Sequence, residues 1–248
     1  MEGIADDLGV LRAGIVSLLE HMRSEERLFA QRLSAAERTR KGSPAQWGAK
    51  AVLAHVAEFR AEQIVRLEAA RDGTEPPEFP IRDHADRELY AAYTGRNWEQ
   101  VAAGAEHTAA RLAELTEELD EHVLFTAGLF PWLRGRALWA QVLVRGVWHP
   151  SAHLHQYLAE RGHFERVVEL QESVLEAATR AGIPDSPGGR PFALYNLACA
   201  RSLVGEVEPA LAELAEAIRL DPALAVAARD DDDLRIVRAD ARFETAVG

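Results

Sequence analysis

The sequence predicts an all-α protein, with a four-helix bundle over residues 1–161 followed by a helical region over residues 162–248 that packs on the bundle. The composition is rich in Ala, Leu, Glu and Arg, and only 7% of the residues are aromatic, so helix is favoured over strand. Apolar residues recur at spacings of three and four, as they do on one face of a helix. A single long connection rich in proline separates the predicted helices, as in bundles that contain a crossover.

Four long amphipathic segments make up the predicted bundle. They span residues 7–35, about 46–71, 97–121 and 137–160. The second segment ends at Asp72-Gly73, where glycine can take the left-handed conformation of a helix cap. Apolar residues make up 48% of the chain and charged residues 27%, which is enough to build a core and argues against disorder.

The connection between the second and third segments, residues 74–95, contains three prolines and is predicted to hold a short helix around Arg87 to Tyr93. So long a crossover often forms a lid or a wall over a pocket. The alternative is a covering loop with no chemical role. Residues 125–136 are predicted to form an irregular apolar turn before the last helix.

The net charge of −12 argues against sequence-independent binding of nucleic acid, which needs Lys and Arg facing the phosphates. It also argues against attraction to anionic membranes. No run reaches the roughly 18 consecutive apolar residues of a membrane helix, and the N-terminus lacks the pattern of a signal peptide. The single cysteine, Cys199, excludes internal disulfides, and we interpret it as a packing residue because no basic residue or histidine adjoins it. We therefore expect a soluble, cytoplasmic protein.

The segment 193–222 resembles one unit of a tetratricopeptide repeat. The resemblance rests on the following residues: Tyr195, Leu197, Ala198, Leu203, Gly205, Ala210, Leu211, Leu214, Ala217, Ile218 and the closing Asp221-Pro222. It implies two closely packed helices and a groove that could take a protein or peptide partner. A degenerate unit precedes this segment, and a terminal cap with Asp230–Asp233 at a helix N-terminus follows it. Because a repeat array needs about three units to bury its faces, we expect this region to pack on the bundle.

Histidines are concentrated in the last helix of the predicted bundle, where His149, His153 and His155 lie within seven positions. Residues four apart on a helix share a face, so His149 and His153 point the same way and His155 points to the other side. An H-x-x-x-H pair can bind one metal ion. His55, at the edge of the apolar stripe of the second helix, is the candidate third ligand. The alternative for His55 is a core residue bonded to a backbone carbonyl.

Pro150 follows His149 directly, inside a segment patterned as a helix. Proline removes the hydrogen bond to the carbonyl four residues back, which here belongs to Gly146. One interpretation is a kink at Gly146 within a continuing helix. The other is a new helix that begins at Pro150 with His149 as its cap.

The residues Trp47, Lys50, Leu53 and His55, in the pattern W-x-x-K-x-x-L-x-H, and the later H-P-x-x-H together resemble the DinB-like four-helix bundles. The similarity covers about the first 160 residues and is greatest to the branch that contains the colibactin self-resistance protein. Related members include thiol-dependent transferases and the mycothiol-dependent maleylpyruvate isomerase. The resemblance implies a divalent metal held by one histidine of the second helix and two of the last, which are His55, His149 and His153 here.

A metal ion at this site implies a hydrolase or thiol transferase that acts on a small electrophilic molecule, in detoxification or self-resistance, with a low-molecular-weight thiol as a candidate co-substrate. Zinc, nickel, manganese and iron are the candidate ions. Glu58 and Glu62 are candidate catalytic bases, although helix glutamates often only face solvent. Four tryptophans are candidates for the pocket wall, with core packing as the alternative: Trp47, Trp132, Trp139 and Trp148.

Two other functions remain open from the sequence. In the first, the repeat-like region binds a partner peptide or mediates self-association, for example as a homodimer. In the second, the bundle binds a small molecule between its helices without a metal. Elemental analysis of untagged protein best distinguishes the metal hypothesis from these alternatives.

Overall fold

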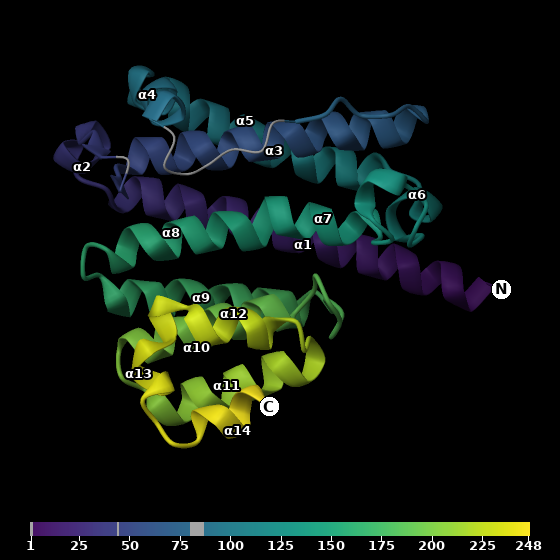
Figure 1. The fold of residues 1–248 in the computed structure, drawn as a ribbon. Helices are drawn as coiled ribbons and strands as arrows, with labels where there is room; N and C mark the ends of the chain where they lie inside the picture. The colour runs from purple at the N-terminus through teal and green to yellow at the C-terminus, as the bar shows by residue number, and fades with distance from the viewer. Residues whose placement is uncertain (1, 44, 80–86) are drawn as a thin grey trace. The chain divides into compact units, whose positions relative to one another are not determined.

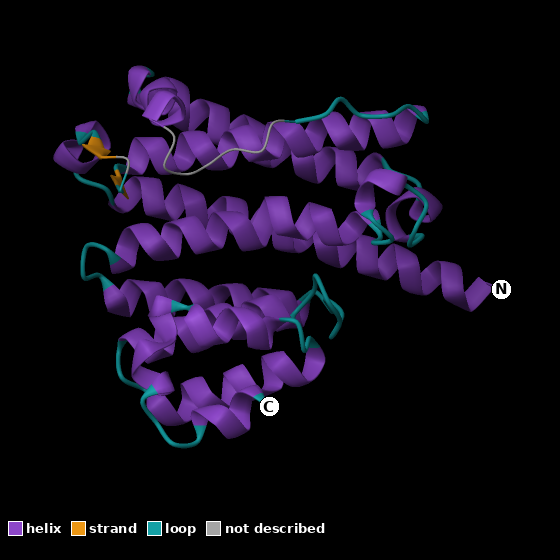
Figure 2. Cartoon of the chain, in the orientation of Figure 1, coloured by secondary structure: helices purple, strands orange, loops and turns teal. Residues whose placement is uncertain are grey.

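The computed structural model describes residues 2–43, 45–79 and 87–248, and these residues are almost entirely helical (Figure 2). The predicted all-α fold is therefore confirmed. The described strands, β1 (Gly42–Ser43) and β2 (Gln46–Trp47), are two residues long and pair antiparallel. The chain divides into two compact units, Met1–Tyr157 and Leu158–Gly248, with the boundary after Tyr157 instead of after residue 161.

The first unit is built from long helices that pack side by side (Figure 1). Besides the two strands, its elements are α1 (Glu2–Arg32), α2 (Ala35–Thr39), α3 (Ala49–Asp72), α4 (Arg87–Gly95), α5 (Trp98–Glu118), α6 (Glu121–Phe125), η1 (Pro131–Leu133), α7 (Leu138–Leu143), η2 (Val144–Trp148) and α8 (His149–Ala159), which extends two residues past the boundary. Helix α5 packs against both α1 and α3, and η2 also contacts these two helices. The core between them consists of fully buried aliphatic residues, among them Ile15, Leu18, Met22, Leu53, Leu67, Leu112 and Leu115.

Two sequence predictions about helix ends are confirmed. Helix α3 ends in a left-handed residue, Gly73, with φ of 67°, whose N–H bonds back to the last turn. The short helix predicted around Arg87 to Tyr93 is α4, which extends to Gly95 and lies against α3. Residues 80–86 of the predicted connection lie outside the described part of the chain.

The last helical segment of the first unit contains a π-helical turn, η2, directly before His149. The N–H of His149 donates to the carbonyl of Val144, five residues back. Pro150 has no N–H to donate, and a widened turn next to it accommodates the missing hydrogen bond. Because His149 is itself helical, with φ −64° and ψ −47°, the alternative of a new helix beginning at Pro150 is wrong. The helix continues through Pro150, as the interpretation of a kink within a continuing helix requires, and a π-helical turn precedes it.

Gly146, in the middle of this π-helical turn, lies where three helices meet. A Cβ atom at this position would collide with Leu19 of α1 and would come within 2.8 Å of Leu112 Cδ2 of α5. Both leucines are buried, so neither has room to move away. Glycine is therefore required here for close packing as well as for the turn beside Pro150.

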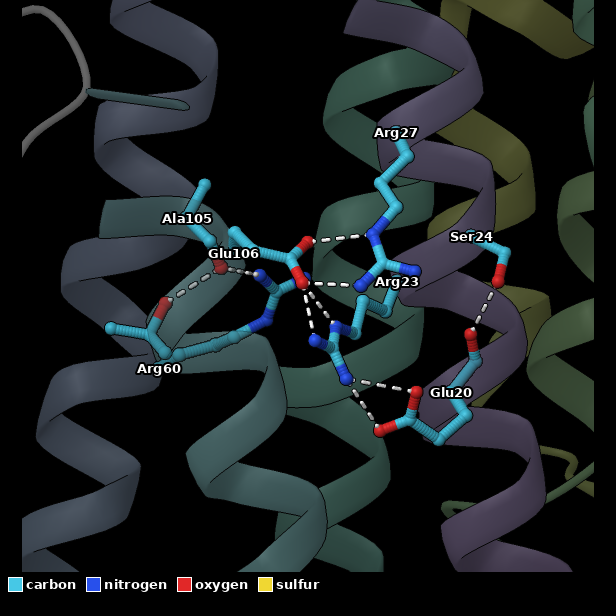
Figure 3. A network of polar contacts seen from close by, with 8 residues as sticks. Glu20, Arg23, Ser24, Arg27, Arg60, Ala105 and Glu106 are labelled. Carbon is cyan, nitrogen blue, oxygen red and sulfur yellow. Dashed lines mark hydrogen bonds and ion pairs between the residues drawn. The ribbon is translucent and has the colours of Figure 1, made fainter. Parts of the chain in front are cut away.

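A network of charged side chains joins α1, α3 and α5 on the side shown in Figure 3. Arg60 of α3 is buried and forms an ion pair with the buried carboxylate of Glu26 of α1, with 3.0 Å between Nη1 and Oε2. Nearer the surface, Glu106 of α5 accepts hydrogen bonds from Arg27 and Arg23 of α1, which lower the pKa of its carboxyl to about 2. A cavity of about 360 Å³ lies along this seam, lined by several alanines and by four of these charged groups: Arg23, Glu26, Arg27 and Glu106.

The second unit has its own hydrophobic core. Its helices are α9 (Phe164–Arg180), α10 (Pro191–Leu203), α11 (Val207–Leu220), α12 (Leu224–Asp230), η3 (Asp232–Leu234), α13 (Arg235–Arg238) and α14 (Phe243–Val247). Helices α10 and α11 form the most extensive contact in the unit, and Ala198, Ala210 and Ala217 are completely buried. Small side chains at these positions let the two helices approach closely.

Cys199 is buried in this core, where its thiol and the hydroxyl of Tyr195 both donate to Asp231 Oδ2, at 3.7 and 2.9 Å. Burial and the nearby carboxylates raise the pKa of the Cys199 thiol well above its ordinary value. A protonated, buried thiol is a poor nucleophile, in agreement with a packing role. Within the described residues, we find no helix with the length and apolar character needed to cross a membrane.

We predict that Gly146→Ala lowers the free energy of unfolding by about 1–3 kcal/mol, because the added methyl group overpacks the contact with Leu19 and Leu112. The matched control is Gly104→Ala in α5, where a Cβ meets no atom within 4 Å. This control should be neutral or stabilising by up to about 1 kcal/mol, since alanine has the higher helix propensity. Urea unfolding of the two variants measures both effects. Equal stabilities of the two variants would contradict the proposed role of Gly146.

The second unit also allows a prediction on pH. Burial raises the pKa of Glu213 to about 7, aided by the carboxylates of Glu172 and Glu206 and opposed by Arg201, whose Nε lies 3.0 Å from Glu213 Oε1. When the pKa of a carboxyl is higher in the folded than in the unfolded state, the folded state binds the proton more tightly. The stability gained from this is complete only below the pKa of the unfolded state, about 4.5. The contribution of Glu213 to stability is therefore lost as the pH rises from about 4.5 through about 7.

We expect the free energy of unfolding of Glu213→Gln, relative to the wild type, to increase by about 1–3 kcal/mol between pH 5 and pH 8. The control is Glu216→Gln on the same helix, whose carboxyl is exposed and has its pKa lowered by Arg219. Over the same pH range the control should remain parallel to the wild type. Chemical unfolding at several pH values measures these free energies. If the free energy of unfolding of Glu213→Gln ran parallel to that of the wild type over this pH range, the raised pKa of Glu213 would be contradicted.

Candidate metal centre

Three histidines from two helices meet inside the first unit. His55 comes from α3 and is completely buried, and His149 and His153 come from the first two turns of α8 and are half-buried. His149 Nε2 lies 3.2 Å from His55 Nε2 and 3.1 Å from His153 Nε2. The sequence prediction named these three residues, and the structure brings them together so that all three could hold a metal ion.

The distances between the nitrogens fit a metal site. Zinc–imidazole bonds of about 2.0–2.1 Å place two ligand nitrogens about 3.3 Å apart in a tetrahedral site. The donor chemistry fits as well. A neutral ring nitrogen offers either one proton or one lone pair, so His149 Nε2 cannot form good hydrogen bonds with both neighbouring nitrogens. A cation, in contrast, is bound by three lone pairs at once.

Aromatic rings surround the three histidines. Phe59, one turn after His55 on α3, packs against the rings of His55 and His149, with centroid distances of 4.4 and 4.7 Å. Trp47 in β2 lies edge-on to His55 at 5.0 Å and nearly parallel to His153 at 6.2 Å. These apolar walls limit the access of water to the ring nitrogens and strengthen electrostatic interactions within the site.

Tyr93 of α4 completes the wall and was not named as a site residue from the sequence. It is completely buried, and its hydroxyl oxygen lies 3.3 Å from His55 Nδ1. The available signal was indirect, because residues 74–95 were predicted as a lid or a wall over a pocket. Helical periodicity within α4 does not reveal which distant side chain Tyr93 meets.

The other three tryptophans named from the sequence come from η1, α7 and η2. Trp132 of η1 packs on Phe130, with 5.3 Å between the ring centroids, and Trp139 is half-buried on α7. Trp148, in η2 directly before His149, is buried and 3% exposed. Of the four tryptophans, the structure places Trp47 against the histidine rings.

The two candidate bases differ in their positions on α3. Glu62 follows His55 by seven residues, close to two full turns, so it lies on nearly the same side of the helix, and it is buried. Glu58 follows by three residues, is turned by about 60° from His55 and is half-buried. His155 is also buried but lies outside the cluster, as the helical phase predicted.

A positive charge lies against the Phe59 ring, which in turn packs on the histidines. The guanidinium carbon of Arg145 is 4.5 Å from the centroid of the Phe59 ring, and the same ring packs on His149. Arg145 belongs to the π-helical turn and precedes His149 by four residues. The turn that accommodates Pro150 therefore also sets the position of a fixed cation beside the cluster.

Comparisons with known proteins add no relative: no family model matches the chain, and neither a curated protein nor a solved structure does. The functional argument therefore rests on the site itself.

Proposed function

We propose that the first unit is a DinB-like four-helix bundle that binds a divalent metal ion through His55, His149 and His153. The observation that carries this proposal is the convergence of three Nε2 atoms, with 3.2 and 3.1 Å between neighbours, from helices far apart in the sequence. Unpaired core histidines would not need to point the same ring nitrogen at one another. The burial of His55 supports the proposal further, since a buried imidazole needs partners for its nitrogens.

The reaction that fits this site is hydrolysis or thiol transfer on a small electrophilic molecule. A divalent ion held by three imidazoles has coordination positions left for exogenous ligands, lowers the pKa of a water or thiol that it binds, and polarises an electrophile. The chain supplies the surroundings for this chemistry. Trp47, Phe59 and Tyr93 exclude bulk water, and Arg145 places a positive charge where an anionic nucleophile or leaving group would be stabilised.

Glu62 is the more buried of the two candidate bases, whereas Glu58 is the nearer to His55 along the helix axis. The position of Glu62 two turns from His55 on the same side of α3 keeps it within the interior of the unit, and its side chain is buried. A carboxylate can take a proton from a bound nucleophile when the nucleophile comes within hydrogen-bond distance, and Glu62 lies about 10 Å from His55 along the axis of α3. Glu58 points further from His55 and is more accessible to solvent.

Metal binding is tested by elemental analysis of untagged protein from cells supplied with zinc, nickel, manganese and iron. We expect about one ion per chain in the wild type and in His155→Ala, and loss of the ion in His153→Ala and His55→Ala. His155→Ala is the matched control, because it removes a buried histidine of the same helix that lies outside the cluster. Circular dichroism shows whether each variant is folded. Wild-type protein without metal after this supplementation would contradict the metal centre.

The two reactions are distinguished by the cobalt-substituted protein. If the protein is a thiol transferase, addition of a low-molecular-weight thiol such as cysteine should produce a sulfur-to-cobalt charge-transfer absorption band. The thiol then binds the ion directly, and the band should be absent in His153→Ala. A cobalt spectrum that does not change with the thiol would leave hydrolysis as the reaction.

A further inference from the structure

Helix α4 is held over the histidine cluster by contacts at both of its sides. Lys50 of α3 donates from Nζ to the carbonyl of Thr94 at 2.8 Å, next to the end of α4 at Gly95. A cation at this position also interacts favourably with the negative end of the helix dipole. One turn earlier, the hydroxyl of Tyr90 donates to the carbonyl of Lys41. These contacts fix α4, and Tyr93 lies between them.

The ring of Tyr93 is enclosed by the aromatic groups of the site. It is completely buried and lies nearly perpendicular to Trp47 and to His55, with centroid distances of 5.9 and 5.8 Å. The ring therefore has little freedom to turn, and its hydroxyl oxygen is held 3.3 Å from His55 Nδ1. The other nitrogen of His55, Nε2, is the one that faces His149.

This geometry determines where the proton of His55 must be when the ring acts as a ligand. A neutral imidazole carries a proton on one nitrogen and a lone pair on the other. To bind an ion through Nε2, His55 must keep its proton on Nδ1, and an acceptor near Nδ1 favours that tautomer. The hydroxyl of Tyr93 can accept as well as donate, and its oxygen is in position to accept a hydrogen bond from this N–H.

We propose that Tyr93 is a positioning residue that accepts a hydrogen bond from His55 Nδ1–H and so directs the Nε2 lone pair into the cluster, and that Lys50 anchors the helix that carries it. The proposal rests on the metal centre proposed above. It also accounts for the W-x-x-K-x-x-L-x-H pattern. Trp47 packs on the ligand rings, Lys50 holds α4 in place, and His55 is the ligand that α4 orients.

The test compares Tyr93→Phe with Tyr90→Phe, which removes a hydroxyl from the same helix away from the cluster. In competition with a chromophoric zinc chelator, Tyr93→Phe should bind zinc about 10–100-fold more weakly than the wild type. Tyr90→Phe removes a contact of α4 but leaves the Tyr93 hydroxyl beside His55, so its loss of zinc affinity should be no larger than that of Lys50→Met and clearly smaller than that of Tyr93→Phe. The visible absorption spectrum of the cobalt-substituted protein should change in Tyr93→Phe alone, since the orientation of His55 changes. Equal or tighter zinc binding by Tyr93→Phe would overturn the proposal.

A second measurement does not depend on metal binding. In metal-free protein, at a pH where the imidazoles are neutral, ¹⁵N NMR shifts of the His55 ring report which nitrogen carries the proton. We expect the Nδ1–H tautomer in the wild type and in Tyr90→Phe, and a loss of this preference in Tyr93→Phe. An unchanged His55 tautomer in Tyr93→Phe would overturn the role of Tyr93. Failure of the metal centre would be seen separately, as wild-type protein that takes up no zinc.

Lys50→Met tests the anchoring of α4. Methionine keeps most of the apolar stem but cannot donate to the carbonyl of Thr94. We expect zinc binding to weaken in the same direction as in Tyr93→Phe but by a smaller factor, since Tyr93 keeps its hydroxyl. Zinc affinity equal to that of the wild type would remove Lys50 from the proposal and leave Tyr93 alone.

Discussion

The close contact of Gly146 with Leu19 and Leu112 is the constraint on which the histidine cluster depends. It sets how deeply the last helical segment of the first unit lies against α1 and α5. His149 follows Gly146 by three residues and His153 by seven, so the depth of this contact also sets the depth of both rings. Because α5 packs on α3 as well, the same contact places these rings opposite His55. A larger side chain at position 146 would push the segment outward and separate the nitrogens.

The π-helical turn and Pro150 act together with this contact. The turn adds a residue to one helical turn, which rotates everything after it relative to a regular α-helix. The rotation determines which side chains of α8 face α3, and Pro150 makes the distortion necessary because it cannot donate a hydrogen bond. The turn also carries Arg145, so one local irregularity positions both a cation and two of the three histidines. π-helical turns are frequent at functional sites. This one accommodates Pro150 and positions His149 and His153.

The two units are stabilised in different ways. In the first, an ion pair between Arg60 and Glu26 is buried among long helices, where the loss of either partner would leave an uncompensated charge. Such a pair favours one alignment of α1 with α3, and α3 carries His55. In the second unit, small side chains at the contact of α10 and α11 allow close approach, and the polar groups of Tyr195 and Cys199 share one acceptor, Asp231. In each unit, therefore, different interactions determine how the helices align.

Helical periodicity sets the phase of each residue on its own helix. From this periodicity alone we could predict the helices, their approximate ends and the position of His155 outside the cluster. The pairing of His149 with His153 followed from the same rule, and His55 was placed by its position on the apolar stripe and by a family resemblance. Only the packing of the helices shows that Trp47, Phe59 and Tyr93 lie against the histidine rings. The packing also determines the form of the irregularity at Pro150.

Contacts between helices depend on how closely the helices approach, and helical periodicity contains no information about that distance. At Gly146 the absence of a single methyl group sets it.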